Sequence, residues 1–480
     1  MFSLALMISL WIPALVQANI YYVATDGNNN NLGTETAPWA SVDKAADTME
    51  AGDTVYVKQG TYSGFAVHTA GTSFDNMVSY LAYPGDTPVI DGQIYFATGA
   101  SYNRIDGFKN IGDKSINMEA SNADHNIISN CKIIGDGNGS GGGIAYSGIG
   151  NIFEGNEICY GGHGLHPGGG AVDGTIIKDN IIHDLIGHGI AAVGGKNEKA
   201  IGNIVYNCSK GTSVGGTGIF FGTGQPENVR VEGNIVWGNE TAEIQVEGTN
   251  AKIIHNTAVT TNGSVYRTYY ILGSNLMAKN NIGYRTGVGE QVVLLPKDAI
   301  TDYNCWFNPE EPKCISRYYD SMTLPQYQTY GQGTHSISQD PKFVNLAGND
   351  FHLQPDSPCI GAGENGVDMG AYGYRGYRPP SEEQKVLNRP NPFRAGKEET
   401  LIEYNLNQPS NVTITIYDLV GQEVWHKSYE AGENGGREDN SVPWDGRNLS
   451  GRVVANGGYI CRIWVQRENK YMLRKIAVVK

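Results

Sequence analysis

Four histidines lie close together in one part of the chain and could act as general acids, general bases or metal ligands. His163 and His166 lie in the glycine-rich run "GGHGLHPGGG" (161–170), and His183 and His188 follow in "NIIHDLIGHGI" (180–190). Imidazole titrates near neutral pH, so it can give or take a proton, and its neutral form binds transition metals. Which of these rings meet depends on the elements that position them.

Those elements repeat. Seven segments between residues 126 and 284 each carry a short apolar run, an asparagine and a second apolar run. A period in the low twenties with β-branched runs and Gly/Asn turns predicts an all-β fold, a parallel β-helix with one coil per repeat. The asparagine amide can donate to and accept from the next coil, which predicts a ladder inside a turn. The asparagines are Asn130, Asn156, Asn180, Asn203, Asn234, Asn256 and Asn281.

Each coil also shares an apolar position in its third strand: Ile144, Leu165, Ile190, Ile219 and Ile244. If these side chains point inward, strand alternation directs their immediate neighbours outward. One predicted outward column is then Gly143, Gly164, Gly189, Gly218 and Glu243, and the other is Ala145, His166, Ala191, Phe220 and Gln245, with Glu247 further along. A glycine-paved trough would suit an extended polysaccharide. The alternative is that the glycines only ease a bend.

In this trough the candidate site residues take different roles. Phe220 could stack on a sugar ring, while Glu243, Gln245 and Glu247 could hydrogen-bond hydroxyl groups. His166 projects into the trough as the candidate catalytic group.

His163 and His188 both lie two residues before the shared apolar position. We therefore expect them to stack in adjacent coils, about 4.8 Å apart. A structural stack and a shared metal ion both fit this spacing, although no third ligand has a comparable placement. His183 falls in a column with Cys159, Tyr206, Trp237 and Tyr284, which predicts side-chain stacking.

The ends of the repeat region carry their own signals. "SVDKAADTMEAGDTVYV" (41–57) predicts a short amphipathic helix with Ser41 as N-cap, followed by a strand, which would cover the open end of the core. Residues 21–62, the segment "DPKFVNLAGNDFHLQPDSPCIGAG" (340–363) and "DMGAY" (368–372) resemble the framing segments of secreted pectate-lyase-like right-handed β-helix proteins. The resemblance implies a β-helix domain over 19–377 and a carbohydrate-active protein, since lyases, hydrolases and epimerases share these segments.

A linker at 378–389 separates this domain from residues 390–480, whose alternating strands predict a small β-sandwich. This part resembles the FlgD-like immunoglobulin domain through Trp444–Gly446 and Gly457–Tyr459. The resemblance implies an export or surface-attachment tail that contacts export machinery and carries no catalytic residue. Residues 1–18 read as a signal peptide. We therefore expect a secreted or cell-surface bacterial protein.

A polysaccharide lyase must remove the proton α to a uronate carboxyl group, neutralise that carboxylate and protonate the leaving oxygen. His166, with Lys178 and Lys196 nearby along the chain, is the best basic set, and His163 and His188 are further candidates. The resemblance implies Ca²⁺ as a possible cofactor. However, the aspartate cluster beside a catalytic lysine that calcium-dependent relatives carry is not evident in these coils.

Two other functions stay open. A glycoside hydrolase needs two carboxylates about 5–9.5 Å apart. Glu243 and Glu247 would lie about 13 Å apart in one strand, and Asp173 with Glu243 is a pair from different coils. The third possibility is a non-catalytic polysaccharide-binding or surface protein.

Composition narrows the partners. The net charge of −14 argues against nucleic acid and anionic membranes, and no segment beyond the leader is apolar enough to span a membrane. We expect a monomer whose partner is a polysaccharide. Of seven cysteines, Cys305 and Cys314 could pair, whereas Cys131, Cys159 and Cys208 are expected to pack as small hydrophobic side chains. No Cys-x-x-Cys occurs, so the sequence gives no sign of a zinc cage.

Overall fold

The computed structural model divides the chain into two units, Met1–Arg375 and Gly376–Lys480, and each is considered by itself. It describes residues 18–479 except 112–115, 120–122, 138–141, 209–215, 262–266, 289–290, 373–385, 392, 407–408, 419–421, 438 and 467–469. The predicted signal peptide, apart from residue 18, and residues 378–385 of the predicted linker lie outside the described residues.

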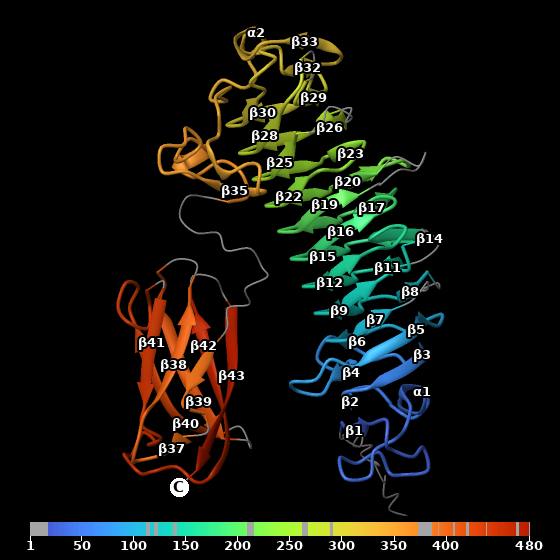
Figure 1. Ribbon diagram of the computed structural model, residues 1–480, viewed down its shortest axis with the longest axis vertical. Coiled ribbons are helices and arrows are strands. Elements are labelled where there is room, and N and C mark those ends of the chain that lie inside the picture. The colour runs from blue at the N-terminus through green and yellow to red at the C-terminus, as the bar shows by residue number, and fades with distance from the viewer. Residues whose placement is uncertain are drawn as a thin grey trace, which may run out of the picture. The chain divides into compact units, whose positions relative to one another are not determined.

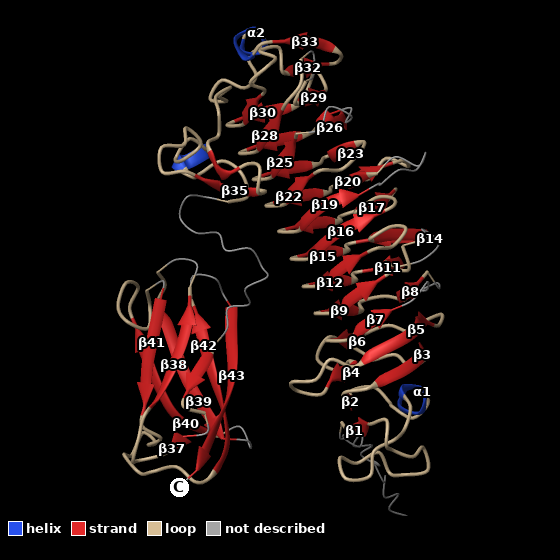
Figure 2. Ribbon diagram, viewed as in Figure 1, coloured by secondary structure: helices blue, strands red, loops and turns tan. Residues whose placement is uncertain are grey.

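The first unit is the expected parallel β-helix (Figure 1). Strands make up nearly all of its regular structure (Figure 2). From Asn103 to Arg317, each coil contributes one strand to each of three parallel sheets, with a corner between consecutive strands. Sheet one contains β1 (Ile20–Val23), β2 (Thr54–Val57), β4 (Val78–Ala82), β6 (Asn103–Asp106), β9 (Ile127–Ser129), β12 (Ile152–Glu154), β15 (Ile176–Lys178), β18 (Lys199–Ile201), β21 (Arg230–Glu232), β24 (Lys252–Ile254), β27 (Met277–Lys279) and β30 (Ile300–Asp302).

The other two sheets are joined at β5, which pairs with strands of both. Sheet two contains β7 (Lys109–Ile111), β10 (Lys132–Ile134), β13 (Glu157–Cys159), β16 (Ile181–Leu185), β19 (Ile204–Cys208), β22 (Ile235–Trp237), β25 (Thr257–Thr260), β28 (Ile282–Arg285) and β31 (Cys305–Phe307). Sheet three contains β3 (Thr61–Val67), β5 (Val89–Phe96), β8 (Ile116–Met118), β11 (Ile144–Ile149), β14 (Leu165–Asp173), β17 (Ile190–Val193), β20 (Thr217–Gly222), β23 (Ala242–Thr249), β26 (Arg267–Ser274), β29 (Val293–Leu295), β32 (Ile315–Arg317) and the antiparallel β33 (Asp320–Met322).

The core is a set of columns of stacked apolar side chains, one from each sheet. The predicted inward positions of sheet three are confirmed, because Ile144, Leu165, Ile190, Ile219 and Ile244 are in register and fully buried. Burying apolar surface in this way stabilises a coil only through its neighbours, since one coil cannot enclose a core alone.

The asparagine ladder forms at the corner between sheets one and two. From Asn156 to Asn304, the backbone N–H of each asparagine donates to the Oδ1 of the next at 2.8–3.0 Å. One position differs from the prediction: Cys131 occupies the ladder site below Asn156, and Asn130 lies one residue earlier in left-handed conformation (φ 52°). Asparagine is tolerated in both roles, so the repeat pattern alone did not separate them.

Short helices lie at the two ends of the solenoid. The predicted helix is α1 (Val42–Ala46), whose N-cap Ser41 accepts a hydrogen bond from the Lys44 backbone and whose apolar residues are buried. At the other end lies α2 (Leu324–Gln328). The hairpin β34 (Phe343–Asn345)–β35 (Asp350–Leu353) and the 3₁₀ turn η1 (Glu364–Gly366) follow it in the chain and return along the side of the solenoid. The hairpin packs on sheet two, because Phe351 contacts Trp237 and Phe343 contacts Tyr284.

The second unit is a β-sandwich-like region with its own core around Trp444, Ile414 and Ile463. One sheet has the order β36 (Leu387–Arg389), β38 (Thr400–Asn405), β41 (Asp439–Trp444). The other has the order β37 (Phe393–Arg394), β43 (Lys470–Val479), β42 (Gly457–Val465), β39 (Val412–Asp418), β40 (Glu423–Tyr429).

The cysteine prediction needs a correction. All seven cysteines are free and buried. Cys305 does not pair with Cys314; its thiol instead donates to Gln339 O and lies beside Cys359. In the part of the chain that the structure describes, no helix is long and apolar enough to cross a membrane.

Candidate active site

Three of the four histidines gather on sheet three. His166 lies on β14, and His163 and His188 lie in the turns that lead into β14 and β17. The His163 and His188 rings stack at 5.6 Å between centroids, as predicted, and the His166 ring lies 5.4 Å from His163. Phe220 on β20 extends the stack, with its ring 5.0 Å from His188. All four rings are half-buried.

Backbone contacts fix the tautomers of two of these rings. The backbone N–H of His188 donates to His163 Nδ1 at 3.0 Å, and that of Thr217 donates to His188 Nδ1 at 3.1 Å. A ring nitrogen that accepts a hydrogen bond carries no proton, so each neutral ring carries its proton on Nε2. His163 and His188 therefore present Nε2–H donors. This argues against a metal ion shared between them, because each lone pair already accepts a backbone N–H.

His166 differs from its neighbours. Its Nδ1 is buried and has no hydrogen-bond partner among the described residues, so no neighbour selects its tautomer. Burial lowers the pKa of His166 to about 4, with a smaller effect of His163, and burial likewise lowers the pKa of His188 to about 4. The pKa of His163 is lowered for the same reason. All three rings are therefore neutral at pH 7.

The predicted substrate-binding residues are only partly brought together. Gln245 occupies the outward column of His166 and Phe220, and its side-chain amide donates to Glu247 on the same face at 2.5 Å. Asp173 lies at the far end of β14 and accepts a hydrogen bond from Asn197.

The glycines of the predicted outward column do not line this face, so the prediction of a glycine-lined trough is wrong. A Cβ on Gly189 would lie 2.3 Å from Val205 Cγ1, and one on Gly218 would lie 2.4 Å from Val236 Cγ1, both side chains of the core. The chain turns the corner between sheets two and three at these residues, so strand alternation does not hold there. The glycines allow close packing of the two sheets.

Glu243 occupies the next place in that column and is therefore inside the solenoid. It is 0% exposed, and its carboxylate accepts hydrogen bonds from Asn239 Nδ2 (2.6 Å) and Thr260 Oγ1 (3.0 Å). Burial raises its pKa to about 7 despite these donors. Glu243 cannot contact a polymer on the outer face, so both carboxylate pairs that included it are lost.

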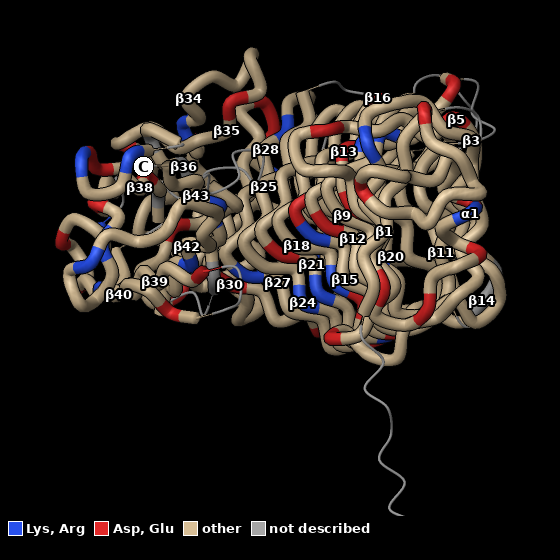
Figure 3. The backbone as a smooth tube through the Cα atoms, turned by 90° about the horizontal axis from the view of Figure 1, so that it is seen from below, with Lys and Arg blue, Asp and Glu red and all other residues tan. Residues whose placement is uncertain are grey.

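Lys178 and Lys196 do not join the histidines. Lys178 lies on sheet one, where its Nζ pairs with Glu154 at 2.5 Å, and Lys196 pairs with Glu227 at 3.1 Å. Figure 3 shows basic and acidic residues mixed along the strands of sheet one. Lys178 belongs to that mixed surface, whereas Lys196 follows β17 and forms β-bridges with Asp173 and Glu227. The short distance in sequence between these lysines and His166 suggested a shared site. Each coil passes over three faces, however, so neighbours in sequence can lie on different faces.

The sequence reasoning missed two polar residues on the histidine face. On β26, Tyr270 continues the outward column beyond Gln245, and Arg267 precedes it by three residues. Burial and a hydrogen bond with Tyr319 raise the pKa of Tyr270 to about 12. Extending the repeat alignment by one coil would have identified Tyr270. In that coil Tyr269 takes the shared buried position that Ile244 occupies in the preceding coil.

The described residues do not fit a calcium site. Ca²⁺ takes six to eight oxygen ligands. In the described ranges, only one group brings together three or more side chains of the types His, Cys, Asp and Glu. It consists of Glu157, Cys159 and His183, and so it contains a single carboxylate. The predicted stacking of His183 is confirmed in part of its column, with Tyr206 at 4.8 Å and Trp237 following at 4.4 Å.

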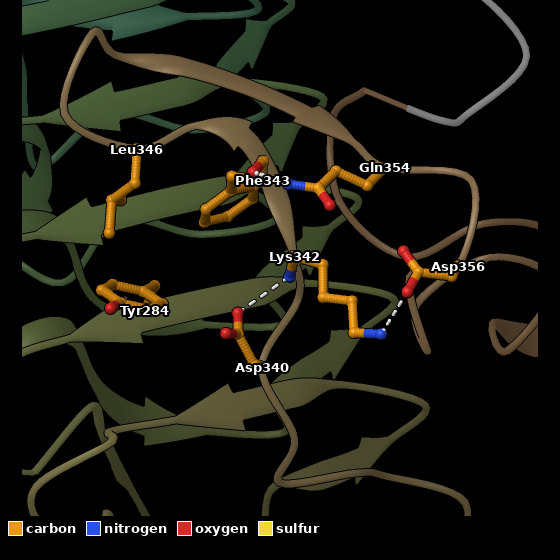
Figure 4. A pocket seen from close by; sticks show the side chains of 7 residues that line it. All are labelled: Tyr284, Asp340, Lys342, Phe343, Leu346, Gln354 and Asp356. Carbon is orange, nitrogen blue, oxygen red and sulfur yellow. Dashed lines mark hydrogen bonds and ion pairs between the residues drawn. The ribbon is translucent and has the colours of Figure 1, made fainter.

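A cavity of about 320 Å³ lies on a different face, where the closing hairpin meets β28 of sheet two (Figure 4). Its lining includes Tyr284, Phe343 and Leu346, with an ion pair between Lys342 and Asp356 at 2.5 Å across its rim. None of the candidate site residues on sheet three lines it.

Two segments match known families. Residues 21–180 match the model of the Pel9A-like right-handed β-helix region, and residues 391–467 match that of the FlgD Ig-like domain. Pectate lyase PEL9 of Emericella nidulans is 37% identical over 93 residues, which cover 18% of this chain and 22% of that protein. The chain thus matches roughly a fifth of the length of this curated relative.

The crystal structure of pectate lyase Pel9A supports the same architecture. It superposes with a TM-score of 0.53 at 15% identity, covering 75% of this chain and 97% of that one. A rhamnogalacturonan lyase has a TM-score of 0.37 at 16% identity, covering 69% and 92%. The chain therefore combines a parallel β-helix, in which residues 21–180 match the Pel9A-like model, with a C-terminal region in which residues 391–467 match the FlgD Ig-like domain.

Proposed function

We propose that this protein is a polysaccharide lyase that binds an extended, uronate-containing polymer along sheet three and cleaves it by β-elimination. The observation that carries the proposal is the cluster of three neutral histidines beside Phe220 on one face of the solenoid. The partial match to pectate lyase PEL9 supports an acidic, pectate-like substrate. The leader pattern and the FlgD-like domain support action outside the cell.

In this mechanism the Nε2–H groups of His163 and His188 donate to the uronate carboxylate and stabilise the charge that develops as the α-proton leaves. His166 is the general base, because it is neutral at pH 7 and the tautomer with its proton on the buried Nδ1 leaves the lone pair on Nε2. Once protonated, His166 donates this proton to the leaving glycosidic oxygen, which balances the step. A bound carboxylate would raise the pKa of His166 from about 4 towards neutrality, which makes the ring a stronger base in the complex. Phe220 supports a sugar ring next to the reacting residue.

Further along the sheet, Gln245, Glu247 and Tyr270 offer donors and acceptors to sugar hydroxyl groups. Ca²⁺ has no fitting donor set among the described residues, so no step is assigned to it. Hydrolysis is less well supported, since it needs two carboxylates on one face and Glu243 is buried.

The proposal predicts unsaturated products. Purified protein incubated with pectate, rhamnogalacturonan and alginate is expected to give rising ultraviolet absorbance together with new reducing ends on at least one polymer. A calcium-selective chelator should leave this rate in place. Reducing ends without absorbance would indicate hydrolysis, and binding without turnover on all three polymers would indicate a carbohydrate-binding protein.

A further inference from the structure

A second cluster of chemically active side chains lies on the outer face of sheet two, away from the histidines of sheet three. Glu157 and Cys159 come from β13, and His183 comes from β16, where it is the register partner of Cys159. One potential ligand atom from each residue lies within 4.8 Å of the other two.

The His183 ring is held in the orientation of a metal ligand. Its Nδ1 lies 2.8 Å from Asp184 Oδ2, and its Nε2 faces Glu157 Oε1 at 3.6 Å. Asp184 is itself held by Asn207 Nδ2 at 3.3 Å, and Tyr206 stacks on the imidazole face. A carboxylate that accepts from one ring nitrogen directs the lone pair of the other outward, as is usual for metal-bound histidine.

The charges around this cluster favour a cation. Glu157 and Asp184 are acidic, and Lys132 pairs with Glu157 at 2.6 Å. Burial, reinforced by Glu157, raises the pKa of the Cys159 thiol to about 11, so without a metal ion this residue is a neutral thiol. A divalent ion would stabilise the thiolate and bridge the facing lone pairs of His183 and Glu157.

We propose that Glu157, Cys159 and His183 bind Zn²⁺ or a similar divalent transition-metal ion, with the fourth position open. The donor set of one thiolate sulfur, one imidazole nitrogen and one carboxylate oxygen is typical of zinc. It does not suit calcium or magnesium, which prefer oxygen ligands. Bonds of about 2.0–2.3 Å require the ligand atoms to close to roughly 3.5 Å, which small side-chain rotations supply. On binding, Cys159 gives its proton to solvent and Glu157 exchanges Lys132 for the metal ion.

The site would join two coils at a specific place. Cys159 precedes the turn that carries His163, and His183 precedes the turn that carries His188. The two turns are already linked by backbone hydrogen bonds from Ile186 to Gly161 and from Gly187 to Gly162. A bound ion therefore ties together the two coils that present the histidines. This inference does not depend on the proposed lyase activity.

The test is metal binding to the chelator-treated full chain. Calorimetry with Zn²⁺ is expected to give one ion per chain, and Co²⁺ is expected to show thiolate-to-cobalt charge transfer and the visible bands of a tetrahedral site. Cys159→Ser should abolish the charge-transfer band. Asp184→Asn keeps a residue that tolerates the left-handed backbone (φ 53°) and should weaken binding by about 10- to 100-fold.

The matched control is His335→Gln. His335 also places Nδ1 2.8 Å from a carboxylate, that of Asp302, and stacks on a tyrosine, Tyr303, at 4.5 Å. It should bind the metal ion like the wild type. Circular dichroism confirms that each variant is folded. Absence of stoichiometric binding, or cobalt binding without the thiolate band, would overturn the proposal.

Discussion

Replacing His166 with alanine is expected to lower kcat on the uronate polymer by about 100- to 10,000-fold, the usual contribution of a general base. The side chain is half-buried on the exterior of β14, between Ala145 and Ala191 in its column, so truncation does not open the core. KM should change little, because Phe220, Gln245 and Glu247 still contact the polymer.

The pH dependence of kcat/KM provides a second test of the role of His166. A free-enzyme pKa of about 4 predicts that kcat/KM stays level through neutral pH and declines as the pH falls towards 4. His335→Ala, an exposed histidine in another part of the solenoid, should leave both parameters unchanged. An unchanged kcat in a folded His166→Ala protein would remove this residue from the chemistry.

Replacing Glu198 with glutamine is expected to stabilise the protein at high pH. Glu198 is 0% exposed; one carboxylate oxygen accepts from Tyr146 Oη at 3.1 Å, and the other, Oε2, is buried with no hydrogen-bond partner among the described residues. Burial raises its pKa to about 8, so the carboxyl group is protonated in the folded protein at pH 6 but ionised in the unfolded chain.

The sign follows from proton linkage. Between pH 4.5 and about 8 the folded state holds a proton that the unfolded state has lost, so stability falls as the pH rises through this window. The glutamine variant does not titrate. It should match the wild type near pH 5 and exceed it at pH 9 by about 2–4 kcal/mol, after allowance for the new amide donors.

Urea unfolding at both pH values measures this difference. Glu154→Gln is the matched control, because that carboxylate is half-exposed and its ion pair with Lys178 contributes about 0–1 kcal/mol. If Glu198→Gln were no more stable than the wild type at pH 9, the carboxyl group would not be buried as described.

The repeat period was enough to predict the solenoid, the asparagine ladder and the stack of His163 on His188, because each depends only on which residues occupy equivalent places in successive coils. The direction in which a side chain points near a corner between two sheets could not be predicted from the sequence. Strand alternation placed Glu243 outside, whereas the chain bends at Gly218 and its equivalents and carries that position into the core.

The sequence also did not show which residues from different parts of the chain share a face of the solenoid. Lys178 is twelve residues from His166 but lies on another sheet. Conversely, Cys159 and His183 are 24 residues apart and lie side by side, so no short motif marks the proposed metal site. In a solenoid, register defines a site better than distance along the chain.

The proposed binding face is tested most directly by a crystal structure of the His166→Ala variant with a bound oligouronide. We expect sugar rings along sheet three, one ring against Phe220 and a carboxylate within hydrogen-bond distance of Nε2 of His163 or His188. An oligouronide bound on sheet one, on sheet two or in the cavity beside Tyr284, with sheet three empty, would contradict this expectation.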